Sequence, residues 1–389
     1  MPEDDSLFTI TEAHLDSGMR GIPVGTCRTS FVDPIEGVHY VGYPVEDLVD
    51  LEEEDVIYLL MNKRLPTEDE SKAFRDELVQ RGENIPTGAL RVLESLTPGS
   101  GHPMDWLSIG IMAMGTAETT GDTRADAMNL IARMPELMAR IFRLRNGKKE
   151  RLRPRKPELG LVENFVHMMG YEGERAERVT RVLRFFFILH MDHGGGNLST
   201  FSGKAVASGW ASIYSSLASA MNALSGPLHG RANQACLEFI QRIGTADHDE
   251  IEAFVRAELD NRRPIYGFGH GVLRAEDPRA RLLIELGEEV CPEDENFLTV
   301  KALREVIPPI LGEIPKISNP HANVDLASGS LLHSVGFRLP EYYTTFFGWA
   351  RVAGICAQIM DERNSRDGRG TPIYRPKYIP RNQPPRRLA

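Results

Sequence analysis

Two histidines and one aspartate lie in short segments where glycine, proline or asparagine shapes the backbone. A histidine can exchange a proton near neutral pH, and a carboxylate can act as a base. Residues of these types beside sharp turns predict acid–base chemistry in a site built from loops. The three are His229, within residues 226–234, His270, at the end of residues 267–270, and Asp325, at the end of residues 323–325.

His229 lies just after Pro227 and shortly before an apolar run at 235–240. Proline is common at the first position of a helix, so the pattern predicts a helix that begins here, with His229 in its first turn. The positive end of the helix dipole disfavours the imidazolium form, and a neutral ring can donate an N–H to a developing enolate. The simpler alternative is a histidine that only satisfies nearby backbone groups.

Asp325 precedes an amphipathic pattern formed by Leu326, Leu331 and Val335. Aspartate at such a position is commonly the N-cap of a helix. It can also be a general base that removes a proton from the methyl group of a thioester. Because that proton is weakly acidic, the base needs a partner that stabilises the enolate, and His229 is the candidate.

His270 ends a glycine-rich segment in which Gly267 and Gly269 flank Phe268. Glycines let the backbone approach a ligand closely and can leave amide groups free to bind it. A plain glycine-rich turn is the simpler interpretation. The segment is not a dinucleotide fingerprint, because neither a strand pattern nor a third glycine at the required spacing accompanies it.

Further candidates lie at residues 190–193, where His190, Asp192 and His193 stand close together. Such a group can hold a metal ion, but no matching histidine, cysteine or carboxylate pattern completes a ligand set, so we expect no metal. Arginines also gather near the C-terminus, where they form either an anion-binding group or a solvated surface. These are Arg351, Arg363, Arg366, Arg369 and Arg375.

The composition limits the function further. The chain has 389 residues, a net charge of −10 and a pI near 5.6, which argues against broad nucleic-acid binding. The one sufficiently long apolar stretch, 205–224, is rich in serine and small residues, so it predicts a single buried helix and no membrane association. Residues 1–5 are acidic and lack the features of a signal peptide, and the four cysteines are scattered, which together predict a reduced, cytoplasmic protein.

Helical periodicity dominates the chain, and strand-like alternation is found mainly at 37–41. The basic segment 148–157 breaks the periodicity and predicts an exposed loop. The Pro- and Arg-rich tail from Pro380 predicts an end that is mobile or draped over a partner. The predicted fold class is therefore mainly α. Apolar residues recur at three- and four-residue steps over 128–141, 179–189 and 251–259.

Taken together, the segments around His229, His270 and Asp325 resemble the active-site signatures of citrate synthase. The resemblance runs from about Arg20 to Arg375, which is nearly the whole chain. It implies a helical fold of a large and a small domain with a cleft between them, and a homodimer or higher homo-oligomer with shared active sites. The large domain would comprise residues 1–227 and 330–389, and the small domain residues 228–329.

The resemblance also implies roles for individual residues. Asp325 would deprotonate acetyl-CoA, His229 would stabilise the enolate, and His270 would polarise the ketone of oxaloacetate. Planar guanidinium groups suit the carboxylates of that substrate. Coenzyme A would be bound by Gly267, Phe268, Gly269 and Arg274, and oxaloacetate by His193, Arg279, Arg351 and, from the neighbouring subunit, Arg375.

The implied reaction condenses acetyl-CoA with oxaloacetate and water to citrate and coenzyme A, as in the tricarboxylic acid cycle. It needs coenzyme A thioester as co-substrate, no tightly bound cofactor and no metal. Alternatives are a 2-methylcitrate synthase that uses propionyl-CoA, a non-catalytic paralogue that binds carboxylates or coenzyme A, and a citryl-CoA-cleaving module with a partner. The chain departs from the family pattern at Gly194 and Gly271 and in a long stretch before Arg375, where Arg366 or Arg369 is an alternative inter-subunit arginine.

Overall fold

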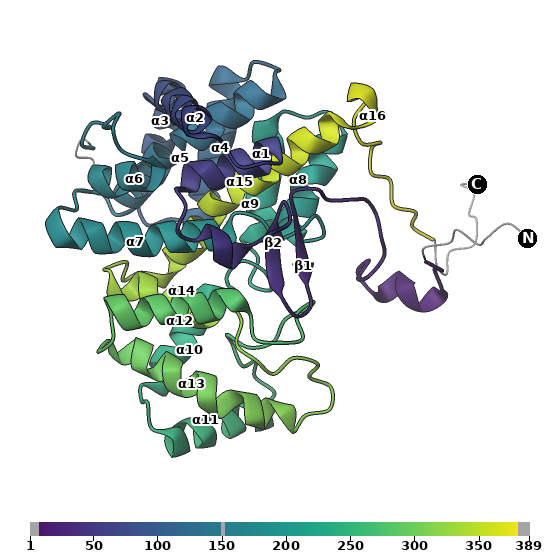
Figure 1. Ribbon diagram of the computed structural model, residues 1–389, viewed down its shortest axis with the longest axis vertical. Helices are drawn as coiled ribbons and strands as arrows, with labels where there is room; N and C mark the ends of the chain where they lie inside the picture. Colours follow the sequence, from purple (N-terminus) through teal and green to yellow (C-terminus); the bar gives the residue numbers. More distant parts are fainter. Residues whose placement is uncertain (1–7, 149–151, 380–389) are drawn as a thin grey trace, which may run out of the picture.

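The computed structural model describes residues 8–148 and 152–379, so the predictions for residues 1–5 and for the tail from Pro380 lie outside the described residues. Within these ranges the chain is mostly helical, as the sequence predicted, and its helices form two groups, one above the other in Figure 1. None of the described helices combines the length and the apolar character that a membrane span requires.

The larger group of helices packs around one buried helix, α15 (Tyr343–Arg363). The helices around it are α1 (Glu53–Asn62), α2 (Glu68–Arg81), α3 (Thr87–Ser95), α4 (Pro103–Glu118), α5 (Thr123–Arg145), α6 (Leu161–Met169), α7 (Gly173–His190), α8 (Leu198–Ser208) and α9 (Ile213–Leu224). α15 contacts six of them, and its residues are buried along nearly its whole length. The apolar runs predicted over 128–141 and 179–189 are confirmed as buried faces of α5 and α7.

The stretch 205–224 was predicted to be a single helix, but it comprises the end of α8 and all of α9. The chain leaves α8 at Gly209, and Trp210 has a φ of 60°, a left-handed conformation in which a right-handed helix cannot continue. Ser212 then caps α9, because its Oγ accepts a hydrogen bond from the Ser215 amide at 3.1 Å. The two helices pack against each other along their lengths.

The smaller group contains the next five helices, which pack mainly against one another and lie below the larger group in Figure 1. They are α10 (Ala232–Ile243), α11 (His248–Asp260), α12 (Pro278–Val290), α13 (Glu295–Gly312) and α14 (Asp325–Ser334). α12 and α14 also contact α7, which joins the two groups. The predicted domain boundary at residue 329 falls inside α14, and the run over 251–259 is confirmed as α11.

A small antiparallel sheet supports the chain beside α7, and its alternation was predicted at 37–41. Its strands, in spatial order, are β1 (Ser30–Asp33), β2 (Gly37–Tyr40) and β3 (Tyr43–Pro44). Tyr40 Oη donates to the Ile188 carbonyl at 2.9 Å and accepts from the Asp192 amide at 3.2 Å, so the sheet holds the end of α7 in place. The remaining short elements are η1 (Glu12–Asp16), η2 (Val45–Leu48), η3 (Pro340–Tyr342) and α16 (Ser365–Gly368).

The basic segment 148–157 is a loop over its described part, but it is not uniformly exposed. Leu152 is buried, and Arg155 Nη1 donates to the carbonyls of Gly82 at 3.1 Å and Ala132 at 2.7 Å. The expectation of an exposed loop is therefore wrong for these two residues, because Leu152 packs on an apolar surface and Arg155 binds backbone carbonyls.

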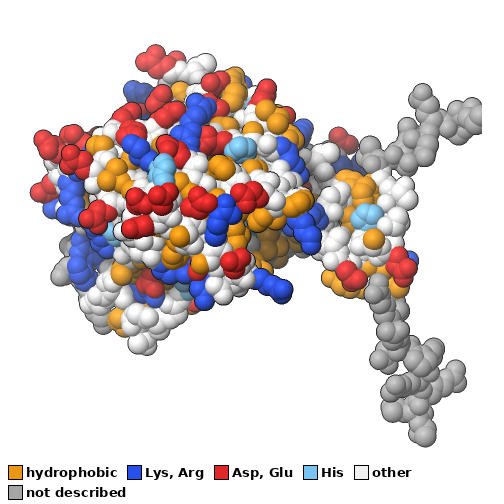
Figure 2. All heavy atoms as spheres, turned by 90° about the horizontal axis from the view of Figure 1, so that it is seen from below, with side chains coloured by type: hydrophobic (Ala, Val, Ile, Leu, Met, Phe, Trp, Pro, Cys, Tyr) orange, Lys and Arg blue, Asp and Glu red, His pale blue; other side chains and the backbone are white. Residues whose placement is uncertain are grey.

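The two terminal segments, residues 8–26 and 369–379, lie on the same side of the molecule and their outer parts project from the body (Figures 1 and 2), whereas Tyr374 is tied to α8. Over the rest of the face in Figure 2, acidic and basic side chains are interspersed. Both projecting segments expose large apolar side chains, which a protein normally covers. The exposed residues are Phe8, Ile10, Leu15, Met19, Val24, Ile373, Tyr378 and Ile379.

Candidate active site

The predicted catalytic residues meet where the two groups of helices face each other. His193 follows α7 and belongs to the larger group, whereas His270 and Asp325 belong to the smaller one. The rings of His193 and His270 lie with their centroids 5.3 Å apart, so the groups are in contact here. Burial lowers the pKa values of His193 and His270 and raises that of Asp325, and the charge of Arg279 acts on all three, which places this guanidinium near them.

His229 lies in the turn between α9 and α10. α10 begins at Ala232, so the prediction of a helix that begins at Pro227 is wrong. The chain folds back first, because the Gly230 amide donates to the carbonyl of Leu224, the last residue of α9, at 3.0 Å. The ring of His229 instead lies at the start of α8, where its Nε2 accepts the Ser199 amide hydrogen at 3.2 Å.

The contact of His229 with α8 defines its protonation state. Nε2 accepts a hydrogen bond, so the proton of the neutral ring is on Nδ1, which is a donor. Burial, and then the charge of Arg351, lower the pKa of His229 to about 4. The ring therefore satisfies a backbone group, as in the simpler alternative, and still keeps one N–H for a ligand. The helix dipole that favours the neutral ring is that of α8 and not that of α10.

His270 has the complementary arrangement. Its Nδ1 accepts the amide hydrogens of Val272 at 3.1 Å and Leu273 at 3.0 Å, so the proton of the neutral ring is on Nε2. Burial, and then the charge of Arg279, lower its pKa to about 4. The site thus contains two neutral histidines, each with one nitrogen bound to the backbone and the other able to donate a hydrogen bond.

The glycine-rich segment before His270 pairs with residues 321–323. Gly267 and Gly269 have φ values of 83° and 81°, which explains why glycine occupies both positions. A Cβ at Gly267 would lie 2.9 Å from Cys236 Sγ, so space is also limiting there. The amide of Gly269 was predicted to be free for a ligand, but it donates to the His321 carbonyl at 2.9 Å.

Asp325 is the first residue of α14, but it does not cap the helix. Asn323 does so, since its Oδ1 accepts the Asp325 amide hydrogen at 3.0 Å, and the N-cap interpretation of Asp325 is therefore wrong. Its carboxylate has no hydrogen-bond donor among the described residues. Burial raises the pKa of Asp325 to about 6, and the charge of Arg279 opposes that shift.

Asn323 connects the two candidate catalytic segments. Besides capping α14, its Nδ2 donates to the Gly269 carbonyl at 2.8 Å, directly before His270. No role was predicted for this residue from the sequence. A signal was present, because asparagine often accepts a hydrogen bond from the backbone two residues on, but its second partner, Gly269, lies 54 residues earlier in the sequence.

Two buried arginines differ in how they are paired. Arg279 Nε and Nη2 donate to Oδ1 and Oδ2 of Asp277 at 3.0 and 2.7 Å, which neutralises this guanidinium. Arg351 Nε donates to the His190 carbonyl at 2.8 Å, whereas its Nη1 has no hydrogen-bond partner within the described chain. Burial lowers the pKa of Arg351 to about 10, so it stays positively charged at neutral pH. Asp277, which caps α12, was not predicted as a site residue.

His193 is held by the residue before it. Asp192 is fully buried, and its Oδ1 accepts the His193 amide hydrogen at 2.9 Å. Burial and the charge of Arg279 hold the pKa of His193 well below its usual range. His190 Nδ1 contacts the Phe186 carbonyl at 2.7 Å, and Asp192 Oδ2 accepts from Thr29 Oγ1 at 2.6 Å, so these two side chains are bound to protein groups.

Two predicted binding residues lie apart from this cluster. Arg274 is exposed, and its Nη1 donates to the carbonyls of Val272 and Leu273 at 2.8 Å each. Arg375 is exposed on the projecting C-terminal segment. The C-terminal arginines do not form one group, because Arg363 binds Thr123 Oγ1 at 2.7 Å on the other side of α15.

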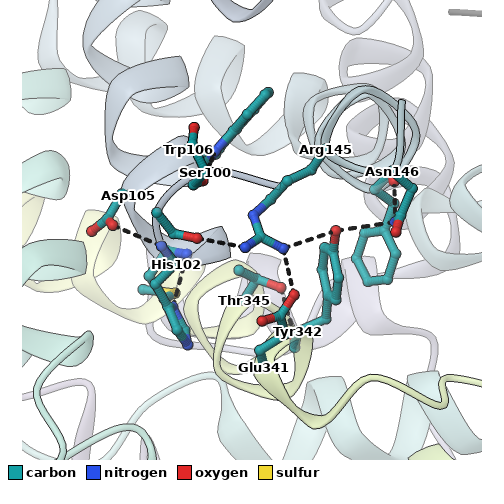
Figure 3. A network of polar contacts seen from close by, with 12 residues as sticks. Ser100, His102, Asp105, Trp106, Arg145, Asn146, Glu341, Tyr342 and Thr345 are labelled. Atoms are coloured by element: carbon teal, nitrogen blue, oxygen red, sulfur yellow. Dashed lines mark hydrogen bonds and ion pairs between the residues drawn. The ribbon is translucent and has the colours of Figure 1, made fainter. Parts of the chain in front are cut away.

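A second buried polar cluster lies beside α10 and is centred on Arg145 (Figure 3). Arg145 Nη1 is paired with Glu341 and donates to Tyr342 Oη at 3.4 Å, while Nη2 binds the Gly101 carbonyl. Asn146 Nδ2 donates to the same tyrosine oxygen at 3.1 Å. This cluster joins the end of α5 to η3 and to the chain before α4, so it supports the fold around the turn of His229.

The chain is similar in sequence and fold to known proteins. The profile of the family described as "Citrate synthase, C-terminal domain" matches residues 18–377. A mitochondrial citrate synthase of Citrus maxima is 32% identical over 402 residues, which cover 96% of this chain and 83% of the relative. Citrate synthase from Thermotoga maritima MSB8 superposes with a TM-score of 0.82 at 30% identity, over 96% of this chain and 97% of that one. A ternary complex of Thermoplasma acidophilum citrate synthase with carboxymethyl coenzyme A and oxaloacetate has the same fold, with a TM-score of 0.84 at 24% identity over 96% and 97% of the two chains.

Proposed function

The chain belongs to the citrate synthase family and is an acyltransferase of the citrate (Si)-synthase type, and we propose that the residues described above condense acetyl-CoA with oxaloacetate. The observation that carries the assignment of roles is the state of three side chains: His229 and His270 are neutral and each keeps one N–H for a ligand, and the Asp325 carboxylate has no hydrogen-bond donor among the described residues. His229 presents Nδ1–H, His270 presents Nε2–H, and Asp325 is the base.

Oxaloacetate binds first in this scheme. Arg351 receives a carboxylate on its unpaired Nη1, and His193 and Arg279 complete the contacts from this subunit. The ketone oxygen accepts the Nε2–H of His270, which withdraws electron density from the carbon to be attacked. The Thermoplasma complex, which shares the fold, holds oxaloacetate together with carboxymethyl coenzyme A.

Acetyl-CoA then loses a methyl proton to the Asp325 carboxylate. The proton is weakly acidic, so the reaction needs the enolate oxygen to be stabilised as it forms, which the Nδ1–H of His229 provides without protonating it fully. The enolate carbon forms a bond to the ketone carbon of oxaloacetate. Water then cleaves the thioester, and citrate and coenzyme A leave. Coenzyme A is therefore a co-substrate, and no step requires a tightly bound cofactor or a metal.

The coenzyme A contacts are proposed for the loop of Gly267, Phe268 and Gly269 and for Arg274. Arg274 binds only carbonyls of its own loop, so its guanidinium can exchange them for a phosphate, which is a stronger, charged acceptor. We also propose that the smaller group of helices, residues 228–329 in the predicted boundaries, is the domain that closes over both substrates and excludes water.

A homodimer is proposed from the projecting terminal segments. Their exposed apolar side chains need a cover, and a second copy of the chain supplies one when each protomer lays its segments on the other. Arg375 lies on one of these segments, outside the site of its own subunit. We therefore propose that Arg375 contacts oxaloacetate in the neighbouring site, with Arg366 and Arg369 as the alternatives.

The cytoplasm is the proposed compartment. The cysteines of this chain are unpaired, which suits a reducing environment. The Citrus maxima relative is named as mitochondrial, so fractionation of cells that express the tagged, full-length protein distinguishes the two locations.

The activity is tested by the release of free coenzyme A on addition of oxaloacetate, with acetyl-CoA and propionyl-CoA compared at equal concentrations. Preference for acetyl-CoA is expected, and preference for propionyl-CoA would assign the chain to methylcitrate synthesis. A blank without oxaloacetate corrects for protein thiols, of which Cys27 is half-buried and the other three are buried. No release from a folded protein that binds oxaloacetate would favour the non-catalytic alternative.

A further inference from the structure

A chain of buried polar side chains leads away from His193. It starts at Asp192 Oδ1, which accepts the His193 amide hydrogen at 2.9 Å and the Gln358 Nε2 hydrogen at 2.7 Å. Lys204 Nζ then donates to Gln358 Oε1 at 3.2 Å. Asp192, Gln358 and Lys204 are at most 4% exposed, so water does not compete for these bonds.

The same chain continues to the C-terminal segment. Lys204 Nζ pairs with Glu362 Oε1 at 2.9 Å, and Tyr374 Oη donates to that oxygen at 3.3 Å. The Tyr374 amide also donates to Ser208 Oγ at 3.1 Å, which ties this residue to the end of α8. The chain of side chains therefore ends one residue before Arg375.

Lys204 connects the two halves of this chain of hydrogen-bonded side chains, and its burial needs an explanation. A buried ammonium is unfavourable unless it is paired, and apolar residues of similar volume would often stabilise a protein equally well. A Cβ at Gly195 would lie 2.8 Å from Lys204 Nζ, so the ammonium also touches the loop that follows His193. A buried network whose members are all bonded fixes one arrangement of the segments that it joins.

We propose that Lys204 is a positioning residue for oxaloacetate binding, which holds the loop of His193 at one end of the chain and the Tyr374–Arg375 segment at the other. The end at His193 depends only on contacts within one subunit. The end at Arg375 rests on the proposed function, in which this arginine enters the neighbouring site. One lysine then orients a contact in its own site and a contact in the site of the partner.

The proposal is tested by calorimetric titration of oxaloacetate into the full-length protein without acetyl-CoA. Gln358→Leu breaks the half near His193, Tyr374→Phe removes the hydroxyl at the far end, and Lys204→Met breaks both. The first two variants are also measured in an Arg375→Ala background. Tyr378→Phe is the matched control, because this tyrosine lies on the same segment and is 89% exposed. Thermal unfolding of each variant shows that the protein is folded.

We expect Gln358→Leu and Tyr374→Phe each to weaken oxaloacetate binding about tenfold, the size of one hydrogen bond to a charged network, and Tyr378→Phe to have no effect. In the Arg375→Ala background, Gln358→Leu keeps its effect and Tyr374→Phe adds none. Lys204→Met loses at least as much affinity as either single variant.

Unchanged affinity in Gln358→Leu would overturn the half of the proposal at His193. Unchanged affinity in Tyr374→Phe, or an undiminished effect in the Arg375→Ala background, would overturn the half at Arg375. Failure of the wild-type protein to bind oxaloacetate would contradict the proposed function itself.

Discussion

Two arginines, Arg145 at the end of α5 and Arg351 within α15, are both buried, to 7% and 1% exposure, yet their surroundings differ. Both terminal nitrogens of Arg145 meet acceptors, from Glu341, Tyr342 and Gly101. Arg351 has a carbonyl on Nε and nothing on Nη1 among the described residues. The two arginines therefore differ in their terminal nitrogens: Nε of Arg145 has no partner in the described chain, but both of its terminal nitrogens bind protein acceptors, whereas Nη1 of Arg351 binds none. A terminal nitrogen without a protein acceptor is the one that the proposed function gives to a substrate carboxylate.

The same contrast separates Asp325 from Asp277. Asp277 is bonded to Arg279 through both oxygens, whereas the carboxylate of Asp325 has no donor in the described chain. We expect Asp325→Asn to lower kcat by about 10²- to 10⁴-fold, the usual contribution of a general base, while oxaloacetate binding is retained. Stopped assays of coenzyme A release and calorimetry measure the two effects.

The free energy of unfolding of Asp325→Asn is a second, independent test of this assignment. Since burial raises the pKa of Asp325 to about 6, its ionised form is unfavourable in the folded state above that pH. The amide removes this charge, so the variant is expected to be about 1–2 kcal/mol more stable at pH 7.5. An inactive variant that is also less stable would indicate a structural role for the carboxylate.

The comparison of the two arginines is tested directly by matched substitutions. Arg351→Gln is expected to weaken oxaloacetate binding about 100-fold, because a substrate carboxylate loses its buried cation. Arg145→Gln is expected to lower the free energy of unfolding by about 1–3 kcal/mol, since Glu341 and the Gly101 carbonyl lose their partner, and to leave the KM for oxaloacetate unchanged. The distinction fails if Arg145→Gln raises that KM as much as Arg351→Gln does.

Asn323 differs from both kinds of side chain. Its Oδ1 and its Nδ2 are both bonded within the protein, but their partners lie in the two candidate catalytic segments. Asn323→Ala should lower kcat by about tenfold or more, since it releases the start of α14 from the loop of His270, and small misplacements of reacting groups are costly. The KM for oxaloacetate is expected to change little, because Arg351 and His193 lie on other elements. A rise in KM without a fall in kcat would show that Asn323 acts on substrate binding instead.

The smallest expected effect is the pH dependence near neutrality. The base must be ionised, so kcat/KM should fall below a pH of about 6, the pKa of Asp325, and approach a tenfold loss per pH unit. His229 and His270 stay neutral there, because their pKa values are about 4. The acidic fall in rate is assigned to Asp325 if kcat/KM of the wild type falls below pH 6 and the residual activity of Asp325→Asn does not.

Local patterns were sufficient to predict α5, α7 and α11, because the apolar face of each recurs within a single segment. They failed where the chain reverses. The bond from Gly230 to Leu224 delays the start of α10 beyond Pro227, and the left-handed Trp210 separates α8 from α9. The periodicity of apolar residues does not predict either reversal, because the position of each depends on how the next helix packs.

Within the site, sequence reasoning selected the residues but not their partners. His229, His270 and Asp325 stand out by type and by their neighbours in the chain. The groups that set their protonation, such as the Ser199 amide for His229, lie many residues away and are backbone atoms that any sequence would supply. Asp277 and Asn323 are near enough to be found, but capping alone explains them until the structure shows their second contacts.

The pairing of Arg279 with Asp277 also decides how the site responds to salt. Arg351, by contrast, has no ion-pair partner in contact among the described residues, and this guanidinium is buried, so dissolved ions scarcely reach it. Arg375 is exposed, where charges are screened beyond about 8 Å at physiological ionic strength. In the proposed dimer, added salt should therefore weaken the contact of Arg375 first, while that of Arg351 persists. The dependence of oxaloacetate affinity on ionic strength would then separate the proposed shares of the two subunits in one site.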